Sequence, residues 1–136
     1  MLSRTEISTE SEVAPIAPFA ITCKELDAVT NLVSVEGELD LTTAPRLKWM
    51  LLDSLQAGRT GLVVDLSRTT FMDSTALGVL VVVNRRLDPA ARMAIACARP
   101  SVMKIFELSG MDGAFAISPT IEEALAYVQR KTVEAR

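Results

Sequence analysis

The stretch Leu62-Val-Val-Asp-Leu-Ser-Arg-Thr-Thr-Phe-Met-Asp-Ser-Thr-Ala-Leu-Gly-Val79 decides how this chain folds. It opens with a short apolar run bounded by Gly61 and Ser67, which predicts a buried central strand. A polar segment follows, which we interpret as a loop, and a second apolar element begins at Asp73-Ser74-Thr75. Because acidic and hydroxyl side chains favour helix N-caps, either Asp73 or Ser74 is expected to cap a helix there.

The apolar element after Ser74 has two competing interpretations. Residues 78–83 are dense in β-branched valine, which favours a strand. Leu77, Leu80 and Leu87 nevertheless recur at helical spacing, and the segment is long for a strand. We therefore predict a helix over residues 74–87, with the leucines facing a sheet.

The segments on either side alternate between strand and helix patterns. Residues 19–26 and 32–39 predict an N-terminal hairpin, in which Val33, Val35 and Leu39 face the core. The later elements are a helix between a Thr42 or Thr43 cap and Gly58, a strand at 93–98, a helix at 100–109, a strand at 114–117 and a helix from Thr120. This order predicts an α/β layer with parallel pairing after the hairpin.

The length of 136 residues fits one domain. Residues 1–17 are rich in Ser, Thr, Glu and Pro and show no period, so we predict a flexible tail there. The folded domain is expected over residues 18–130, followed by a C-terminal tail at 131–136. The net charge of −3 argues against a direct nucleic-acid partner.

Several function classes are disfavoured by what the chain contains. The sequence has no histidine and two cysteines, so neither a metal site, a cofactor nor an enzymatic activity is predicted. The longest apolar run, residues 76–83, is too short to span a membrane, and the acidic N-terminus does not fit an export signal. We therefore expect a cytoplasmic protein with no membrane partner. A nucleotide-binding cleft at the strand ends stays open.

Some apolar residues are assigned to packing roles. Cys23 and Cys97 lie in apolar segments and are expected to be free thiols that behave as small hydrophobes. Trp49, with Met50, Met93 and Met103, is also interpreted as a packing residue.

Three motifs carry a family resemblance. They are Gly37-Glu-Leu-Asp40, Val64-Asp-Leu-Ser67 and Phe71-Met-Asp-Ser-Thr75 with Leu77-Gly78. In order and spacing they resemble the anti-sigma factor antagonists of the STAS superfamily, over residues 19–128. The resemblance implies a STAS-like single domain of the α/β class, with a mixed β-sheet of about five strands, an N-terminal hairpin and about four packed helices.

The resemblance also implies a partner-switching mechanism. Unphosphorylated members bind an anti-sigma factor that is also an ATP-dependent serine kinase, and this binding frees the sigma factor. The kinase phosphorylates the serine after the motif aspartate, which is Ser74 here, and a metal-dependent serine/threonine phosphatase resets the switch. Asp40 matches a loop aspartate on the partner-facing surface of the family.

The expected partner surface follows from the predicted helix. If the leucines face the sheet, an outward stripe continues from Ser74. The residues expected to contact the partner are Asp40, Asp73, Ser74, Thr75, Gly78, Val82 and Arg85. A phosphate on Ser74 would stand at the positive end of the helix dipole, near backbone N–H groups, so the fold should tolerate it.

The chain departs from the family pattern at one position, and other interpretations stand beside the switch. Ala76 occupies a position where the family commonly has glycine. Alanine is a better helix former than glycine by about 1 kcal/mol, so the helix start should be stiffer here. Ser74 could act only as a helix cap, and Val82 could be an ordinary exposed residue. The alternative function is a non-phosphorylated STAS subunit of a transporter or signalling assembly.

Overall fold

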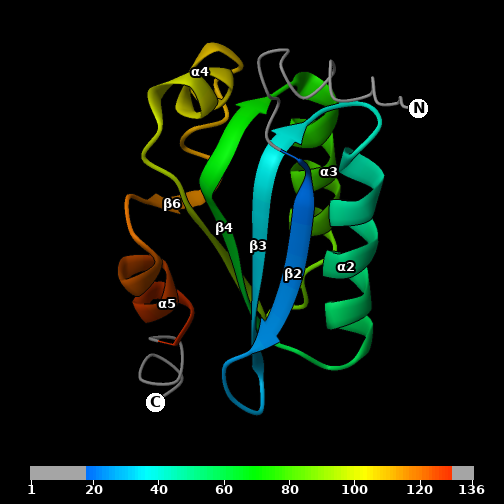
Figure 1. The fold of residues 1–136 in the computed structure, drawn as a ribbon. Helices are drawn as coiled ribbons and strands as arrows, with labels where there is room; N and C mark the ends of the chain where they lie inside the picture. Colours follow the sequence, from blue (N-terminus) through cyan, green and yellow to red (C-terminus); the bar gives the residue numbers. More distant parts are fainter. Residues whose placement is uncertain (1–17, 130–136) are drawn as a thin grey trace, which may run out of the picture.

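The computed structural model describes residues 18–129, so the predicted tails at 1–17 and 131–136 lie outside the described residues. A five-stranded sheet forms the middle layer of this part of the chain, in the order β2-β3-β4-β5-β6 (Figure 1). The strands are β2 (Ala20–Glu25), β3 (Thr30–Leu39), β4 (Gly61–Met72), β5 (Arg92–Ala96) and β6 (Ala116–Ser118). β2 pairs antiparallel with β3, and the remaining pairs are parallel. The predicted mixed sheet with an N-terminal hairpin is confirmed.

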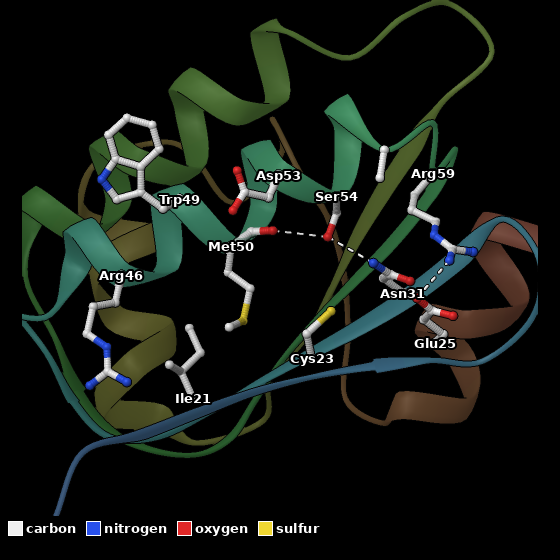
Figure 2. A pocket seen from close by; sticks show the side chains of 11 residues that line it. Ile21, Cys23, Glu25, Asn31, Arg46, Trp49, Met50, Asp53, Ser54 and Arg59 are labelled. Atoms are coloured by element: carbon white, nitrogen blue, oxygen red, sulfur yellow. Dashed lines mark hydrogen bonds and ion pairs between the residues drawn. The ribbon is translucent and has the colours of Figure 1, made fainter.

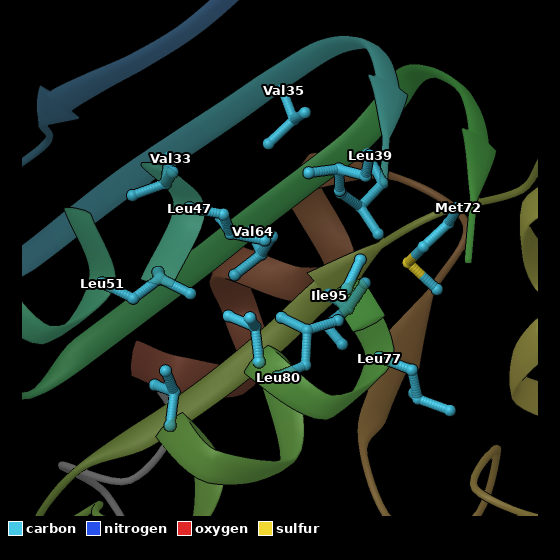
Figure 3. Close-up of a cluster of buried hydrophobic side chains, with 14 of the residues drawn as sticks. Val33, Val35, Leu39, Leu47, Leu51, Val64, Met72, Leu77, Leu80 and Ile95 are labelled. Carbon is cyan, nitrogen blue, oxygen red and sulfur yellow. The ribbon is translucent and has the colours of Figure 1, made fainter. Parts of the chain in front are cut away.

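Helices cover the sheet unequally on its two faces. The helices of the described residues are α2 (Ala44–Gln56), α3 (Ser74–Arg85), α4 (Pro100–Leu108) and α5 (Ile121–Gln129). The larger core lies between the sheet and α2, α3 and α4, and it includes Leu47, Leu80 and Ile95 (Figure 3). A smaller core packs α5 against the opposite face, around Val63 and Ala124.

The residues of the central strand explain this two-sided burial. The first six residues of β4 are all buried, because α3 and α5 cover opposite faces of the sheet there. Such strands are apolar on both faces rather than alternating. Val33, Val35 and Leu39 on β3 are at most 1% exposed, which confirms their predicted core orientation.

The loop predicted after Leu66 is wrong. β4 continues through Met72, and its second half pairs with the end of β3, with Phe71 opposite Glu38. Irregular register and a positive φ of 98° at Gly37 accompany this extension. The second half of β4 is polar because its outward residues face solvent, whereas Thr69 is buried and donates a hydrogen bond of 3.0 Å to the Val35 carbonyl.

Helix α2 ends as its glycine predicts. Gly58 has φ of +90°, which a residue without Cβ adopts readily. The Gly58 N–H donates to the Leu55 carbonyl at 3.0 Å, and the Arg59 N–H donates to the Ser54 carbonyl at 3.1 Å. This pair of bonds is a Schellman motif, and it directs Arg59 back toward the hairpin.

Two packing predictions are wrong, while the three methionines pack in or against the core as predicted. Trp49 is 61% exposed, because it lies two positions from the buried Leu47 and Leu51 and therefore on the opposite side of α2. Cys23 is exposed on the edge strand β2, whereas Cys97 is buried; both are free thiols. An apolar segment on an edge strand is covered only as far as a neighbouring helix reaches.

Candidate functional site

The end of β3 and the start of α3 meet at one corner of the sheet. Leu39 on β3 is opposite Met72 on β4, so the residues that follow them are brought together although they are far apart in sequence. The Asp73 N–H donates a hydrogen bond of 3.1 Å to the Leu39 carbonyl. Parallel pairing therefore places the two motif aspartates, Asp40 and Asp73, at the carboxyl ends of adjacent strands.

Asp73 is the N-cap of α3. Its backbone is extended, and its Oδ1 accepts hydrogen bonds from the Thr75 N–H at 2.9 Å and the Ala76 N–H at 3.1 Å. Ser74 is consequently the first helical residue, and its side chain is exposed. The predicted helix and its start are confirmed, and the cap is the aspartate rather than the serine.

This capping changes the surroundings expected for a phosphate. The Asp73 side chain already binds the Thr75 and Ala76 N–H groups, and the Leu77 N–H donates to the Asp73 carbonyl at 3.2 Å. Of the backbone N–H groups expected beside a phosphate on Ser74, those of Thr75 and Ala76 are therefore already occupied. A phosphate there would keep the favourable field of the helix dipole, but it would also stand beside the Asp73 carboxylate.

Asp40 organises the loop between β3 and α2. Its Oδ1 accepts hydrogen bonds from the Thr42 hydroxyl at 2.8 Å and from the Thr42 N–H at 3.0 Å. These bonds, with weaker help from Thr43, hold the pKa of Asp40 below its ordinary value. The carboxylate is therefore charged, and its position in the loop is set by the two threonines.

Thr43 does not cap α2 with its side chain, although it occupies the N-cap position. Its hydroxyl instead donates to the Glu38 carbonyl at 2.7 Å and accepts from the Asp40 N–H at 2.8 Å. The prediction of a threonine-capped helix is right in position and wrong in chemistry. The hydroxyl ties the loop to the end of β3, beside α3.

The outward face of α3 matches the predicted stripe. Ser74, Gly78, Val82 and Arg85 are exposed, while Leu77 and Leu80 are buried against the sheet. A Cβ at Gly78 would meet no heavy atom within 4 Å, so this part of the helix is open to solvent. The stripe is a narrow surface with one small residue between a hydroxyl and an exposed aliphatic side chain.

Two exposed apolar residues near the aspartates were not predicted from the sequence as part of the site. Leu41 is 70% exposed directly after Asp40, and Phe71 is 47% exposed two residues before Asp73. The signal that could have found them is their position, because each flanks a motif aspartate. Thr75, between Ser74 and the buried Ala76, is half-buried.

The comparison with protein families decides what kind of domain this is. The family model described as the STAS domain matches residues 20–124. The chain belongs to the STAS domain family. Its relatives include the anti-sigma-F factor antagonist RsfB of Mycobacterium tuberculosis, which is 26% identical over 98 residues, covering 72% of this chain and 80% of that protein.

Solved structures place this STAS domain among the same relatives. An anti-sigma factor antagonist from Mycobacterium paratuberculosis superposes with a TM-score of 0.77 at 27% identity, covering 82% of this chain and 95% of that one. The anti-sigma factor antagonist SpoIIAA in its unphosphorylated form gives a TM-score of 0.70 at 26% identity, covering 81% and 96%. The predicted STAS-like fold class is confirmed.

Two further observations concern the described residues of the STAS domain. Between residues 18 and 129, no group of three or more His, Cys, Asp or Glu side chains is arranged to hold a metal ion. Over the same range, every helix is too short or too polar to cross a bilayer.

Proposed function

We propose that this STAS domain is an anti-sigma factor antagonist, and that phosphorylation of Ser74 weakens its complex with an anti-sigma factor. The observation that carries the proposal is the position of Ser74, exposed as the first residue of α3 beside the capping Asp73. The names of the relatives support the antagonist role. The similar structure of SpoIIAA is described as the unphosphorylated form of that protein, which supports regulation by phosphate.

The proposed partner surface runs from the Asp40 loop along the outward face of α3. Gly78 leaves room for a partner backbone or side chain to approach the helix, and Val82 offers an exposed apolar contact. Asp40, Asp73 and Arg85 supply charges around this contact. A small apolar centre with charged surroundings is typical of a specific protein interface.

The phosphate acts on the complex rather than on the fold. A phosphoserine carries about −1.5 to −2 charges at neutral pH and would stand beside the negative Asp73. Because the side chain of Ser74 is exposed, water can solvate the phosphate in the free protein. A docked partner would remove that water and bring its own groups against the concentrated charge, which costs binding free energy.

The chemical step requires a partner enzyme for each direction. In the forward step, the Ser74 oxygen bonds to the γ-phosphorus of ATP, the bond to the ADP oxygen breaks, and the serine proton passes to a base. We assign that base to the anti-sigma factor acting as a serine kinase. In the reverse step, water cleaves the phosphate ester and releases inorganic phosphate. We assign catalysis of this step to a metal-dependent serine/threonine phosphatase. The STAS domain itself is the substrate and not the catalyst.

The experiment compares Ser74→Ala and Ser74→Asp in pull-downs with the cognate anti-sigma factor. We expect Ser74→Ala to bind like the unmodified protein and Ser74→Asp to bind about tenfold more weakly or worse. Thr120→Asp is the matched control, because Thr120 caps α5 through a 3.2 Å bond from the Glu123 N–H and aspartate is an equally good cap. It adds the same charge at another helix start.

Mass spectrometry after incubation with the anti-sigma factor and ATP gives the second measurement. One phosphate on Ser74 is expected, and a phosphate on Thr75 instead would contradict the site. Equal binding of Ser74→Ala and Ser74→Asp would remove the switch and favour the non-phosphorylated subunit of a transporter or signalling assembly.

A further inference from the structure

A groove separate from the proposed switch lies between the edge strand β2 and helix α2 (Figure 2). Its volume is about 490 Å³, within the range of about 300–1,000 Å³ that is typical of small-molecule pockets. None of the residues that line it belongs to the proposed partner surface. The groove therefore needs an explanation of its own.

The middle of the groove is apolar apart from Asp53, which lies beside Met50 on α2 (Figure 2). Ile21 and Cys23 line it from β2, and Met50 lines it from α2, with the three side chains turned toward one another (Figure 2). Trp49 lies at the rim and is 61% exposed. An exposed tryptophan beside a concave apolar surface is typical of a binding site, because covering both surfaces removes them from water.

The inner end of the groove contains a buried acceptor. Asn31 is 5% exposed, and within the described residues no group donates a hydrogen bond to its Oδ1. Its Nδ2 donates to the Ser54 hydroxyl oxygen at 2.9 Å, and that hydroxyl donates to the Met50 carbonyl at 3.0 Å. Because the single Ser54 proton is used on Met50, Ser54 can only accept from Asn31.

The orientation of the Asn31 amide is therefore set by its neighbours. The Asn31 nitrogen faces Ser54, and the Asn31 carbonyl oxygen is the atom without a hydrogen-bond donor at this end of the groove (Figure 2). A buried acceptor without a donor is unfavourable in a folded protein. The oxygen has almost no exposed surface, so a ligand that carries a hydroxyl or amine proton to this end would correct that deficit once the Asn31 side chain turns toward it.

The outer end of the groove contains an available cation. Arg46 lines the groove, is exposed, and stacks over the Phe19 ring at 5.0 Å. Between residues 18 and 129 no carboxylate forms an ion pair with it. Arg59 at the inner end is different, because an ion pair of 2.9 Å holds it to Glu25 and its guanidinium donates to the Asp27 carbonyl.

We propose that this groove binds an elongated amphipathic carboxylate. The carboxylate lies against the Arg46 guanidinium, which can bind it with two parallel hydrogen bonds. The apolar chain covers Ile21, Cys23 and Met50, and a terminal hydroxyl or amine donates to Asn31. Arg46 and Ser54 are roughly 12 Å apart along the helix axis, since each helical residue adds about 1.5 Å. That spacing sets the length of the ligand.

The sole tryptophan of the chain makes the binding measurable, since Trp49 lies at the rim of the groove. The full chain is titrated with 10-hydroxydecanoate while Trp49 emission is recorded, and a saturable shift to shorter wavelength is expected. Arg46→Glu should raise the dissociation constant at least tenfold. Lys104→Glu is the matched charge control on α4, because Lys104 is exposed and outside the groove, and it should change the constant less than twofold.

Decanoate tests the inner end, because it lacks the terminal hydroxyl. It should bind at least threefold more weakly than 10-hydroxydecanoate, and only the hydroxylated ligand should shift the NMR signals of the Asn31 side-chain amide strongly. Equal affinity of the two ligands would overturn the role of Asn31. Circular dichroism confirms that the variants keep their fold.

Three results would overturn the site as a whole. One is a Trp49 emission that does not change saturably with 10-hydroxydecanoate. Another is equal weakening by Arg46→Glu and Lys104→Glu, which would indicate a general charge effect. The third is a Trp49 already protected from acrylamide quenching in the ligand-free full chain, which would mean that another segment or a second copy fills the groove.

Discussion

Replacing Gly78 with alanine should stabilise the protein. Gly78 lies inside α3 and has no positive φ, so its backbone suits any residue, and a Cβ there would meet no heavy atom within 4 Å. Glycine inside a helix costs about 0.5–1 kcal/mol relative to alanine, because it loses more conformational freedom on folding. Gly78→Ala should raise the free energy of unfolding by that amount and the melting temperature by about 2–5 °C.

The assay is urea and thermal unfolding followed by circular dichroism, with the unmodified chain measured in parallel. The slope of the free energy against urea should stay the same, since the change adds one exposed methyl group. A lower midpoint for Gly78→Ala would refute the reasoning, because it would mean that the outward face of α3 is covered or that the backbone at Gly78 is not helical.

The same position tests the proposed partner surface. Gly78→Gln should also be stabilising, since glutamine is a good helix former, but its bulk should weaken binding of the anti-sigma factor. Ala126→Gln is the matched control, because Ala126 is exposed on α5 at the opposite face of the sheet. If Gly78→Gln binds as well as Ala126→Gln, Gly78 lies outside the interface.

Three further predictions concern single groups. Asp73→Ala should cost about 1 kcal/mol in urea unfolding by removing two cap bonds, while Asp73→Ser should cost less than half of that; equal losses would contradict capping. Since hydrogen bonds lower the pKa of Asp40, its contribution to stability is present above the ordinary value of 3.8 and is lost as pH falls through the lowered pKa. Thr42→Val should move that pKa upward in a carboxyl NMR titration, and an unchanged pKa would argue against the hydroxyl as its main cause. Because burial raises the pKa of the Cys97 thiol, a thiol reagent should modify Cys23 in the native protein and Cys97 only after unfolding; rapid modification of both would exclude the buried position.

Local pattern was enough to predict most of the elements. The helix from Ser74 was predicted against the strand propensity of its valines, because Leu77 and Leu80 repeat with the period of a helix and both are buried. The end of α2 at Gly58 was predicted from one residue type, since the left-handed conformation favours glycine. Such signals depend only on neighbours along the chain.

Predictions failed where the outcome depended on which other segment of the chain packs against a residue or pairs with it. Residues 67–72 are polar like a loop, yet they continue β4 because the end of β3 pairs with them. Trp49 and Cys23 are apolar like core residues, yet the side of α2 and the edge strand that carry them are exposed. Hydrophobicity alone does not reveal which face of an element a neighbour covers.

The candidate site and the groove show the same division. The motif Asp73-Ser74-Thr75 and a helix cap at Asp73 or Ser74 were visible in the chain, whereas the closeness of Asp73 to Asp40 required the parallel pairing of β3 and β4. The groove joins Asn31, Arg46 and residues of β2, which no sequence spacing connects.

The sequence by itself determined the helices, the core face of β3 and the serine that stands at a helix start, because periodicity and caps are properties of neighbouring residues. Only the tertiary structure decided that the two motif aspartates lie at the ends of adjacent strands, and which buried acceptor lacks a donor. Those outcomes depend on hydrogen bonds between segments distant in the chain, which form only when the sheet and helices are packed together.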